Sequence, residues 1–252
     1  FNLPAGGIDR DADNATILPT LAECRDHPGT VLDRVRPRPA QDAIAAAALA
    51  LGANDRQKMA CSLLAKSRFV TVQGPPGCGK THILKLLRCI MSSVTRPGSI
   101  GVVCGPTHAA VDNFLEAILK EKGLDGLCPE AHPDRTVRLA EPSKIRSSCL
   151  EASLEARFEL ATGKAPKDCP KDFLAFKRSE IGSTFKWACC TVERAYNIWG
   201  GKEGDLSGPS LSSILVDEAA MIPPSSLAIL VAMASPDGCP LARVGDPARV
   251  CA

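Results

Sequence analysis

One stretch of this chain reads Phe69-Val70-Thr71-Val72-Gln73-Gly74-Pro75-Pro76-Gly77-Cys78-Gly79-Lys80-Thr81. Its opening residues, Phe69 to Val72, predict a short apolar strand. The part from Gly74 to Thr81 fits the pattern G-x-x-x-x-G-K-[ST] at every fixed position, and a helix is expected from Lys80 to Ser92. Glycines let the backbone curl so that successive N–H groups point at one anion, and the helix N-terminus adds a favourable dipole. The stretch therefore predicts a phosphate-binding loop.

The residue types in this loop suggest a role for particular side chains. Lys80 is expected to bring positive charge to the β- and γ-phosphates of ATP, and the Thr81 hydroxyl is expected to bind Mg²⁺. The alternative is a glycine-rich loop that precedes a helix by chance, and the strand in front of the loop argues against it. The residues predicted to contact the nucleotide here are Gly74, Pro75, Pro76, Gly77, Cys78, Gly79, Lys80, Thr81 and His82.

Apolar segments alternate with helical stretches on both sides of the loop. Helices are predicted at about residues 41–65 and at His108–Lys120. Apolar strands that are bounded by turn residues and separated by helices indicate an α/β fold, a P-loop type with a parallel sheet and helices on both faces. Further strands are predicted at Ile100–Cys104, Val137–Leu139, Trp187–Thr191, Ser213–Val216 and Leu241–Val244.

Composition divides the chain into two parts. Residues 1–40 are rich in Pro, Gly, Asp and Arg, which predicts a flank or linker without an assigned role, and residues 41–252 are predicted to form one domain. Residues 121–186 of that domain are expected to be a polar helical insertion. The lysine-rich part of the insertion reads as a solvated helix face, with a phosphate-contacting edge as the alternative. The chain starts at Phe1 and stops at Ala252, so we expect a fragment of a longer protein.

Two carboxylates follow one of the predicted strands, in Ser213-Ile214-Leu215-Val216-Asp217-Glu218. Two acids at the end of a buried strand are costly unless a cation compensates their charge, and a metal beside Lys80 would do so. Asp217 is therefore expected to hold Mg²⁺ through a water, and Glu218 to act as the base for the attacking water. An acidic surface turn is the alternative. The predicted catalytic residues are Lys80, Asp217 and Glu218.

The bulk composition excludes some classes of protein. A net charge of +2 is lower than a dedicated nucleic-acid module carries, and no apolar run is long enough to cross a membrane. The 12 cysteines include no CxxC pair and lie apart from the histidines, so scattered reduced thiols are favoured over a metal-thiolate site. We expect an intracellular protein, cytoplasmic or nuclear.

Several short motifs resemble those of superfamily 1 helicases of the Upf1-like group, which includes the nonsense-mediated-decay and senataxin-type helicases. The motifs occur along this chain in the same order as in that family. Besides the loop itself, these motifs are Asn54-Asp55-Arg56-Gln57, Gly105-Pro106-Thr107-His108-Ala109-Ala110-Val111-Asp112-Asn113, Cys189-Cys190-Thr191, Asp217-Glu218-Ala219-Ala220 and Gly245-Asp246-Pro247. The resemblance runs from Asn54 to Pro247. It implies the first RecA-like ATP-binding domain of such a helicase.

The resemblance also implies roles for residues outside the loop. Gln57 would read the adenine, although it could be an ordinary exposed glutamine, and Gly245 and Asp246 would sense the γ-phosphate. The residues implied to grip single-stranded RNA or DNA are Pro106, Thr107, Asn113 and Thr191. Thr107 could also be the N-cap of its helix, and His108 is expected to start that helix rather than to catalyse. Trp187, Tyr196 and Trp199 are expected in the core, with base stacking as the alternative.

Two residues depart from the family pattern. Met221 and Arg249 stand where the family usually has glutamines that link the γ-phosphate to domain movement. The resemblance implies an ATP-dependent RNA or DNA helicase that works with a second RecA-like domain, which this sequence does not contain. The first alternative is a non-motor nucleic-acid-binding or scaffold protein with a degenerate P-loop. The second is an oligomeric remodeller of the AAA+ type, which the motifs disfavour.

Overall fold

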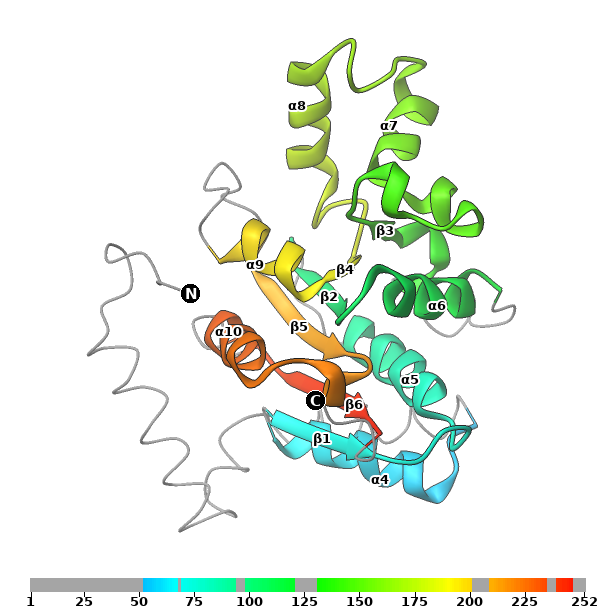
Figure 1. Ribbon diagram of the computed structural model, residues 1–252, viewed down its shortest axis with the longest axis vertical. Helices are drawn as coiled ribbons and strands as arrows, with labels where there is room; N and C mark the ends of the chain where they lie inside the picture. The colour runs from blue at the N-terminus through cyan, green and yellow to red at the C-terminus, as the bar shows by residue number, and fades with distance from the viewer. Residues whose placement is uncertain are drawn as a thin grey trace, which may run out of the picture.

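Six parallel strands form the centre of the molecule (Figure 1). The computed structural model describes residues 52–67, 69–93, 98–120, 131–200, 209–234 and 239–246. The strands are β1 (Phe69–Gln73), β2 (Ile100–Gly105), β3 (Thr136–Arg138), β4 (Trp187–Thr191), β5 (Leu211–Val216) and β6 (Leu241–Gly245). Across the sheet their order is β1-β6-β5-β2-β4-β3, and all neighbours pair in parallel. The predicted α/β fold is confirmed.

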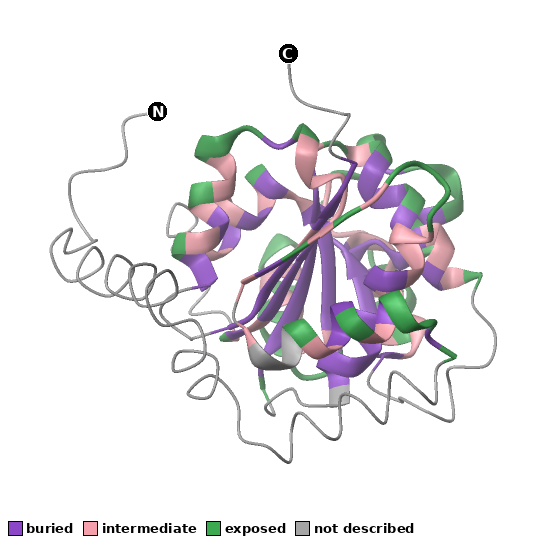
Figure 2. Cartoon of the chain, turned by 90° about the horizontal axis from the view of Figure 1, so that it is seen from below, coloured by how far each residue is buried: buried purple, intermediate pink, exposed green. Residues whose placement is uncertain are grey.

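Helices cover both faces of the sheet, and the inner strands are buried between them (Figure 2). Val103 and Leu215 belong to one buried cluster, together with residues of α4 (Asp55–Lys66), α5 (Lys80–Ser93) and α6 (His108–Leu119). Their neighbours Val102 and Ile214 point to the other face and belong to a second cluster, with residues of α9 (Val192–Trp199) and α10 (Pro224–Ala234). Successive side chains of a strand point to opposite faces, so burial on both sides explains the near-continuous apolar runs of the strands.

Most helices that flank the sheet follow a strand in the chain, whereas the first of them precedes β1. Five helices and one short 3-10 helix matter most for the site: α4 (Asp55–Lys66), α5 (Lys80–Ser93), α6 (His108–Leu119), α9 (Val192–Trp199), α10 (Pro224–Ala234) and η5 (Ala219–Met221). The carboxyl ends of parallel strands lie at one edge of the sheet. The residues that follow β1, β2, β4, β5 and β6 therefore meet along that edge, where the sequence motifs are found.

The helix predicted at residues 41–65 is partly wrong. Residues 52–54 are not helical, and Gly52 has a φ of +69°, a left-handed conformation that interrupts a helix. Helix α4 begins at Asp55 because Asn54 caps it. The Asn54 side chain accepts from the Gln57 N–H, and the Gln57 side chain accepts from the Asn54 N–H, which forms a capping box. Residues 1–51, including the predicted linker, lie outside the described residues.

The predicted helical insertion at residues 121–186 needs a second correction. Near its start, the described part contains the 3-10 helix η2 (Pro133–Arg135) and then β3, the outer strand beside β4, so this region contributes to the sheet before it forms α-helices. After β3, two more 3-10 helices, η3 (Pro142–Lys144) and η4 (Ser147–Ala152), lead to α7 (Leu154–Thr162) and α8 (Pro170–Glu180). Residues 121–130 are not among the described residues.

Helices α7 and α8 form a small unit at one end of the molecule (Figure 1). The Phe158 ring meets the rings of Phe173 and Phe176 edge-on, with centroids 5.3 Å apart in both pairs. Helix α8 buries none of its residues, and the Lys164 ammonium pairs with the Asp172 carboxylate at the surface. Helix α8 is therefore exposed, as a solvated face and a phosphate-contacting edge both require, and the choice between the two stays a prediction.

Trp187 is a core residue, as expected. Its side chain is 1% exposed, and the indole Nε1 donates to the Ser92 hydroxyl at 2.7 Å. Tyr196 and Trp199 are partly buried and pack against the second cluster. Among the described residues, no helix combines the length and apolarity that crossing a membrane requires.

Candidate nucleotide-binding site

The loop between β1 and α5 has the backbone that a phosphate cradle needs. Gly77 and Gly79 adopt φ values of +77° and +86°, which other residue types rarely tolerate. The Gly74 N–H donates to the Gly245 carbonyl at 3.2 Å, so the loop is tied to the end of β6. Helix α5 starts at Lys80, as predicted, and the first N–H groups of a helix lack carbonyl partners within the helix itself.

The Lys80 ammonium folds back onto this loop. Its Nζ donates to the carbonyl of Gly74 at 2.7 Å and to that of Pro75 at 2.6 Å. Backbone carbonyls are neutral acceptors, and they compete poorly with a phosphate oxygen for an ammonium group. The structure thus holds the Lys80 charge at the loop by contacts that an anion could replace.

The acidic pair lies at the end of β5, in the centre of the sheet edge. The Asp217 N–H donates to the Cys104 carbonyl at 2.9 Å, and this bond continues the pairing of β5 with β2. Glu218 has a φ of +47°, and no other described residue except glycine has a positive φ. The Glu218 N–H donates to Asp217 Oδ1 at 2.8 Å. A strained backbone of this kind costs about 1–3 kcal/mol and is found most often at functional sites.

The environment of Asp217 disfavours its charge. Burial raises the pKa of this carboxyl from 3.8 to about 6, and the neighbouring Glu218 carboxylate adds to the rise. The N–H of Glu218 and the Lys80 ammonium act in the opposite direction but do not cancel it. A carboxylate in this situation gains from a bound cation, since a positive charge would offset the cost of burial.

The loop and the acidic pair share a pocket of about 170 Å³. The pocket is lined by Pro76, Lys80, Thr81, Ala110, Asn113, Asp217, Glu218, Ala220, Met221 and Asp246. Lys80 and Thr81 come from α5, while Asp217 and Glu218 come from the end of β5. The structure therefore brings the cationic and acidic residues singled out in the sequence to one place.

The donor set in this pocket fits Mg²⁺ better than a transition metal. Among the described residues, no group of three or more His, Cys, Asp or Glu side chains could hold a metal, and no disulfide joins the described cysteines. Mg²⁺ needs only one or two protein oxygens when phosphates and waters complete its shell. The Thr81 hydroxyl and the Asp217 carboxylate line the pocket and could supply them.

The end of β6 contributes a third acid to the pocket. Asp246 is only 7% exposed and lines the pocket wall. Gly245 lies against η5, where an added Cβ would come within 2.9 Å of the Ala220 N atom. This close approach requires glycine, and it links the end of β6 to the turn that carries Glu218. Pro247 and Arg249 lie outside the described residues.

Other residues predicted to touch the nucleotide lie around the loop. Gln57 is 6% exposed, and its Nε2 lies 3.4 Å from the position that a Cβ on Gly79 would take. Its carbonyl oxygen serves the capping box of α4, and its amide nitrogen faces the loop. The adenine contact of Gln57 stays a prediction. His82 lies in the first turn of α5 and does not line the pocket.

The residues predicted to bind nucleic acid fall into two groups. Thr107 is the N-cap of α6 and Thr191 the N-cap of α9, at the carboxyl ends of the neighbouring strands β2 and β4, and Pro106 precedes Thr107. Asn113 lies further along α6 and lines the nucleotide pocket. The spacing of Ala110 and Asn113 would have placed both on one helix face. Sequence patterns alone could not show that this face looks toward α5.

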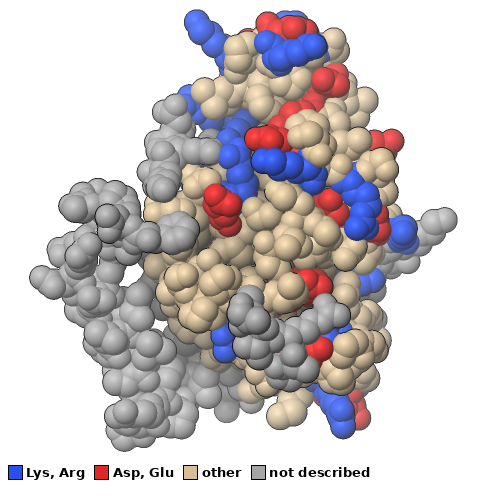
Figure 3. All heavy atoms as spheres, in the orientation of Figure 1, with Lys and Arg blue, Asp and Glu red and all other residues tan. Residues whose placement is uncertain are grey.

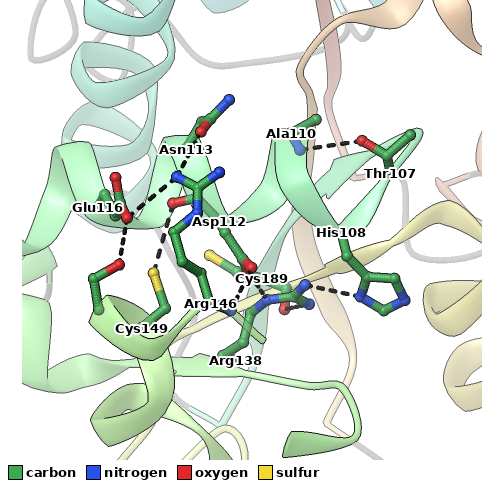
Figure 4. A network of polar contacts seen from close by, with 11 residues as sticks. Thr107, His108, Ala110, Asp112, Asn113, Glu116, Arg138, Arg146, Cys149 and Cys189 are labelled. Carbon is green, nitrogen blue, oxygen red and sulfur yellow. Dashed lines mark hydrogen bonds and ion pairs between the residues drawn. The ribbon is translucent and has the colours of Figure 1, made fainter. Parts of the chain in front are cut away.

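A buried ion pair next to the pocket was missed in the sequence. Arg138 of β3 is fully buried, and its Nε donates to Asp112 Oδ1 of α6 at 2.7 Å (Figure 4). The same guanidinium donates to the Cys189 carbonyl at 3.2 Å and lies 3.1 Å from His108 Nδ1. Burial and the Arg138 charge lower the pKa of His108. The signal was present, since a carboxylate among the apolar residues of α6 requires a cationic partner.

Comparisons with known proteins agree with this geometry. A family model described as an AAA domain matches residues 52–186. The Regulator of nonsense transcripts 1 homolog of Drosophila melanogaster is 29% identical over 157 residues, which are 59% of this chain and 13% of that relative. The DNA polymerase alpha-associated DNA helicase A of Schizosaccharomyces pombe is 34% identical over 103 residues, which are 40% of this chain and 14% of that relative.

A third relative, Helicase sen1 of Schizosaccharomyces pombe, is 31% identical over 110 residues, which are 36% of this chain and 6% of that relative. The chain therefore spans 14% or less of the length of each of these three relatives. The family model, in contrast, covers more than half of the chain. The chain belongs to this AAA-domain family and carries a helicase-type ATP-binding domain of the Upf1-like group.

Proposed function

We propose that this chain is the first motor domain of an ATP-dependent superfamily 1 helicase, which hydrolyses ATP to move on single-stranded nucleic acid. The observation that carries the proposal is the shared pocket of Lys80, Thr81, Asp217 and Glu218. A phosphate loop alone would support binding of a nucleotide. The acidic pair beside it supports hydrolysis, because phosphoryl transfer depends on positioning and on neutralisation of charge.

Each residue of the pocket has a part in the proposed reaction. The N–H groups of the loop and the Lys80 ammonium bind and orient the β- and γ-phosphates. The Thr81 hydroxyl and the Asp217 carboxylate would hold Mg²⁺, which supplies charge neutralisation when it is bound. Glu218 orients the attacking water and accepts its proton. The strained turn at Glu218 fixes that carboxylate in the pocket before the substrate arrives.

The nucleic acid is proposed to bind along the carboxyl edge of β2 and β4. There Thr107 and Thr191 each accept from a backbone N–H at a helix start, with Ala110 at 3.1 Å and Arg194 at 3.3 Å. Figure 3 shows both signs of charge interspersed over one face of the molecule, without a continuous basic surface there. Contacts through a few hydroxyls and backbone groups suit the sugar-phosphate backbone, which RNA and DNA share.

The proposal extends to the whole protein. Translocation requires two domains that close and open on one strand, so we propose that a second RecA-like domain works with this one. An arginine finger from such a domain is worth about 10³–10⁵-fold in rate, so this chain by itself should hydrolyse ATP slowly. The helicase names of the relatives favour this motor over an oligomeric remodeller, and they support an intracellular site, cytoplasmic or nuclear.

One observation favours a non-motor protein as the second candidate. Met221 lines the pocket and is 37% exposed, in the position where the resemblance implies a glutamine. A thioether is only a weak acceptor and cannot donate to a phosphate or a water. A scaffold that binds nucleic acid and nucleotide without turnover would tolerate this residue.

ATP turnover, measured with and without single-stranded RNA or DNA, separates the two candidates. The motor predicts that the strand stimulates turnover in a protein that includes the second domain, and that Glu218→Gln abolishes the stimulation. Which polymer stimulates more identifies the substrate. No turnover with or without a strand, or a rate no higher than that of Glu218→Gln, would favour the scaffold. Met221→Gln should raise the ATP turnover of a motor, whereas a scaffold with the same substitution should still show no turnover.

A further inference from the structure

Asn113 connects the nucleotide pocket to a segment of the chain that none of the sequence motifs includes. Its side chain is exposed and lines the pocket together with Lys80, Thr81 and Glu218. On its other side, Asn113 Oδ1 accepts from Arg146 Nη1 at 2.9 Å (Figure 4). Arg146 lies between η3 and η4, in the region that follows β3. The pocket wall is thus in direct contact with residues beyond the phosphate loop and the acidic pair.

The partner of Asn113 decides which way its amide points. A guanidinium group has five N–H donors and no acceptor, so the atom of Asn113 that faces Arg146 must be the carbonyl oxygen. The amide nitrogen then lies on the other side of the group, as Figure 4 shows. Its two N–H groups can serve only acceptors, and the terminal phosphate of a nucleotide offers acceptor oxygens.

Arg146 is held at three points on α6. Its backbone N–H donates to Asp112 Oδ2 at 2.9 Å, and its guanidinium lies 3.2 Å from Glu116 Oε1. The Ser148 hydroxyl donates to the same Glu116 oxygen. Hydrogen bonds from Ser148 and then from Arg146 lower the pKa of Glu116, so its carboxylate stays charged and keeps Arg146 in place. The orientation of Asn113 is therefore set by groups that do not belong to the pocket.

We propose that Asn113 binds the terminal phosphate of the nucleotide through its amide N–H groups, and that Arg146 is the positioning residue that orients this amide. The proposal rests on the proposed function, because it requires a nucleotide in this pocket. It differs from the role that the resemblance implied for Asn113, which was a contact with nucleic acid. It also predicts that Asn113 distinguishes ATP from ADP, since only ATP carries the terminal phosphate.

The test measures the affinity of the chain for two ligands, a non-hydrolysable ATP analogue and ADP, both with Mg²⁺. Asn113→Asp keeps the size of the side chain and an oxygen for Arg146, but it places an acceptor where the phosphate needs a donor. We expect a loss of about 10-fold or more for the analogue and a change of less than about twofold for ADP. Asn113→Ala should show the same selectivity with a smaller loss.

Arg146 is tested by its effect on the same ratio. Arg146→Met leaves the Asn113 amide without its donor, so the preference for the ATP analogue over ADP should fall by about threefold. Arg146→Lys keeps a donor and should restore the preference. In a purely structural role, Arg146 would affect both ligands equally. Lys144→Ala is the matched control, because it removes a nearby exposed cation that pairs with Glu141.

The outcomes separate this proposal from the proposed function. If the unaltered chain binds neither ligand, the pocket is not a nucleotide site and both proposals fall. If it binds both ligands but Asn113→Asp and Asn113→Ala leave their ratio unchanged, only the role of Asn113 is overturned. Thermal unfolding of each variant confirms that a change in affinity does not result from loss of the fold.

Discussion

The nucleotide pocket and the contact between α6 and residues 136–149 lie side by side, but different forces hold their charged groups. In the pocket, the Lys80 ammonium is bonded to two backbone carbonyls, and the Asp217 carboxylate accepts from a backbone N–H. In the α6 contact, the Arg138 guanidinium and the Asp112 carboxylate are bonded directly to each other inside the protein. Charges that are neutralised by a charged partner stabilise the fold. Charges held by backbone dipoles remain available for a ligand.

The largest effect on stability is expected from a substitution in the α6 contact. Asp112→Ala leaves the Arg138 guanidinium buried without its carboxylate, which should lower the free energy of unfolding by about 3–5 kcal/mol. Denaturant unfolding measures this change. Asp172→Ala is the control, because it removes a carboxylate from the exposed pair with Lys164 and should change the stability by less than about 1 kcal/mol. Equal effects of the two substitutions would remove the distinction between the buried and the exposed pair.

A smaller effect is expected in the pocket and depends on pH. The pKa of Asp217 is about 6 in the folded chain and 3.8 for the unperturbed group, so the folded state binds its proton more tightly. As the pH rises from about 4 to 6, the unfolded state releases this proton first, and stability falls through that window by up to about 3 kcal/mol. Asp217→Asn should lose this dependence and be more stable than the unaltered chain at pH 7, without metal or nucleotide.

The difference between Asp217→Asn and the unaltered chain isolates this group from the other carboxylates. Unfolding is measured in urea at several pH values between 4 and 8. A difference that does not change with pH would show that Asp217 is well solvated. The pocket would then lack the buried charge that a bound cation is expected to offset.

The smallest effect on stability is expected when alanine replaces either of two glycines with similar backbone conformations. Gly79 and Gly163 have φ values of +86° and +70°, and an alanine at either position should cost about 1–2 kcal/mol of stability. Gly163 caps α7, with open space where a Cβ would be added, whereas Gly79 belongs to the phosphate loop. Gly79→Ala should therefore weaken nucleotide binding and Gly163→Ala should not. Equal nucleotide affinities in the two variants would show that the loop geometry does not serve phosphate.

Sequence patterns were most informative where one residue type is required locally. The strand before Gly74, the helix from Lys80 and the carboxylates after β5 followed from short motifs and apolar runs. The start of α4 was missed although its signal was present, because Asn54 and Gln57 have the spacing of a capping box. The strand β3 was predicted near its observed place but was also counted within the helical insertion.

Contacts between distant parts of the chain could not be predicted. Arg138 and Asp112 are 26 residues apart, and no pattern in the sequence pairs them. The place of Asn113 in the pocket depends on how α6 is rotated against α5, which is decided by packing over the whole of that face. A helix position predicts which residues share a face, but not what that face meets.

Calorimetric titration of ATP into this chain, with and without Mg²⁺, tests the central claim most directly. We predict binding that strengthens with Mg²⁺ and that Lys80→Ala weakens by about 10-fold or more, since a charge-assisted contact to phosphate is lost. The control is Lys164→Ala, which removes an exposed lysine far along the chain from the loop and should leave the affinity unchanged. Binding that is indifferent to Mg²⁺ and equal in Lys80→Ala, in protein shown to be folded, would contradict the account.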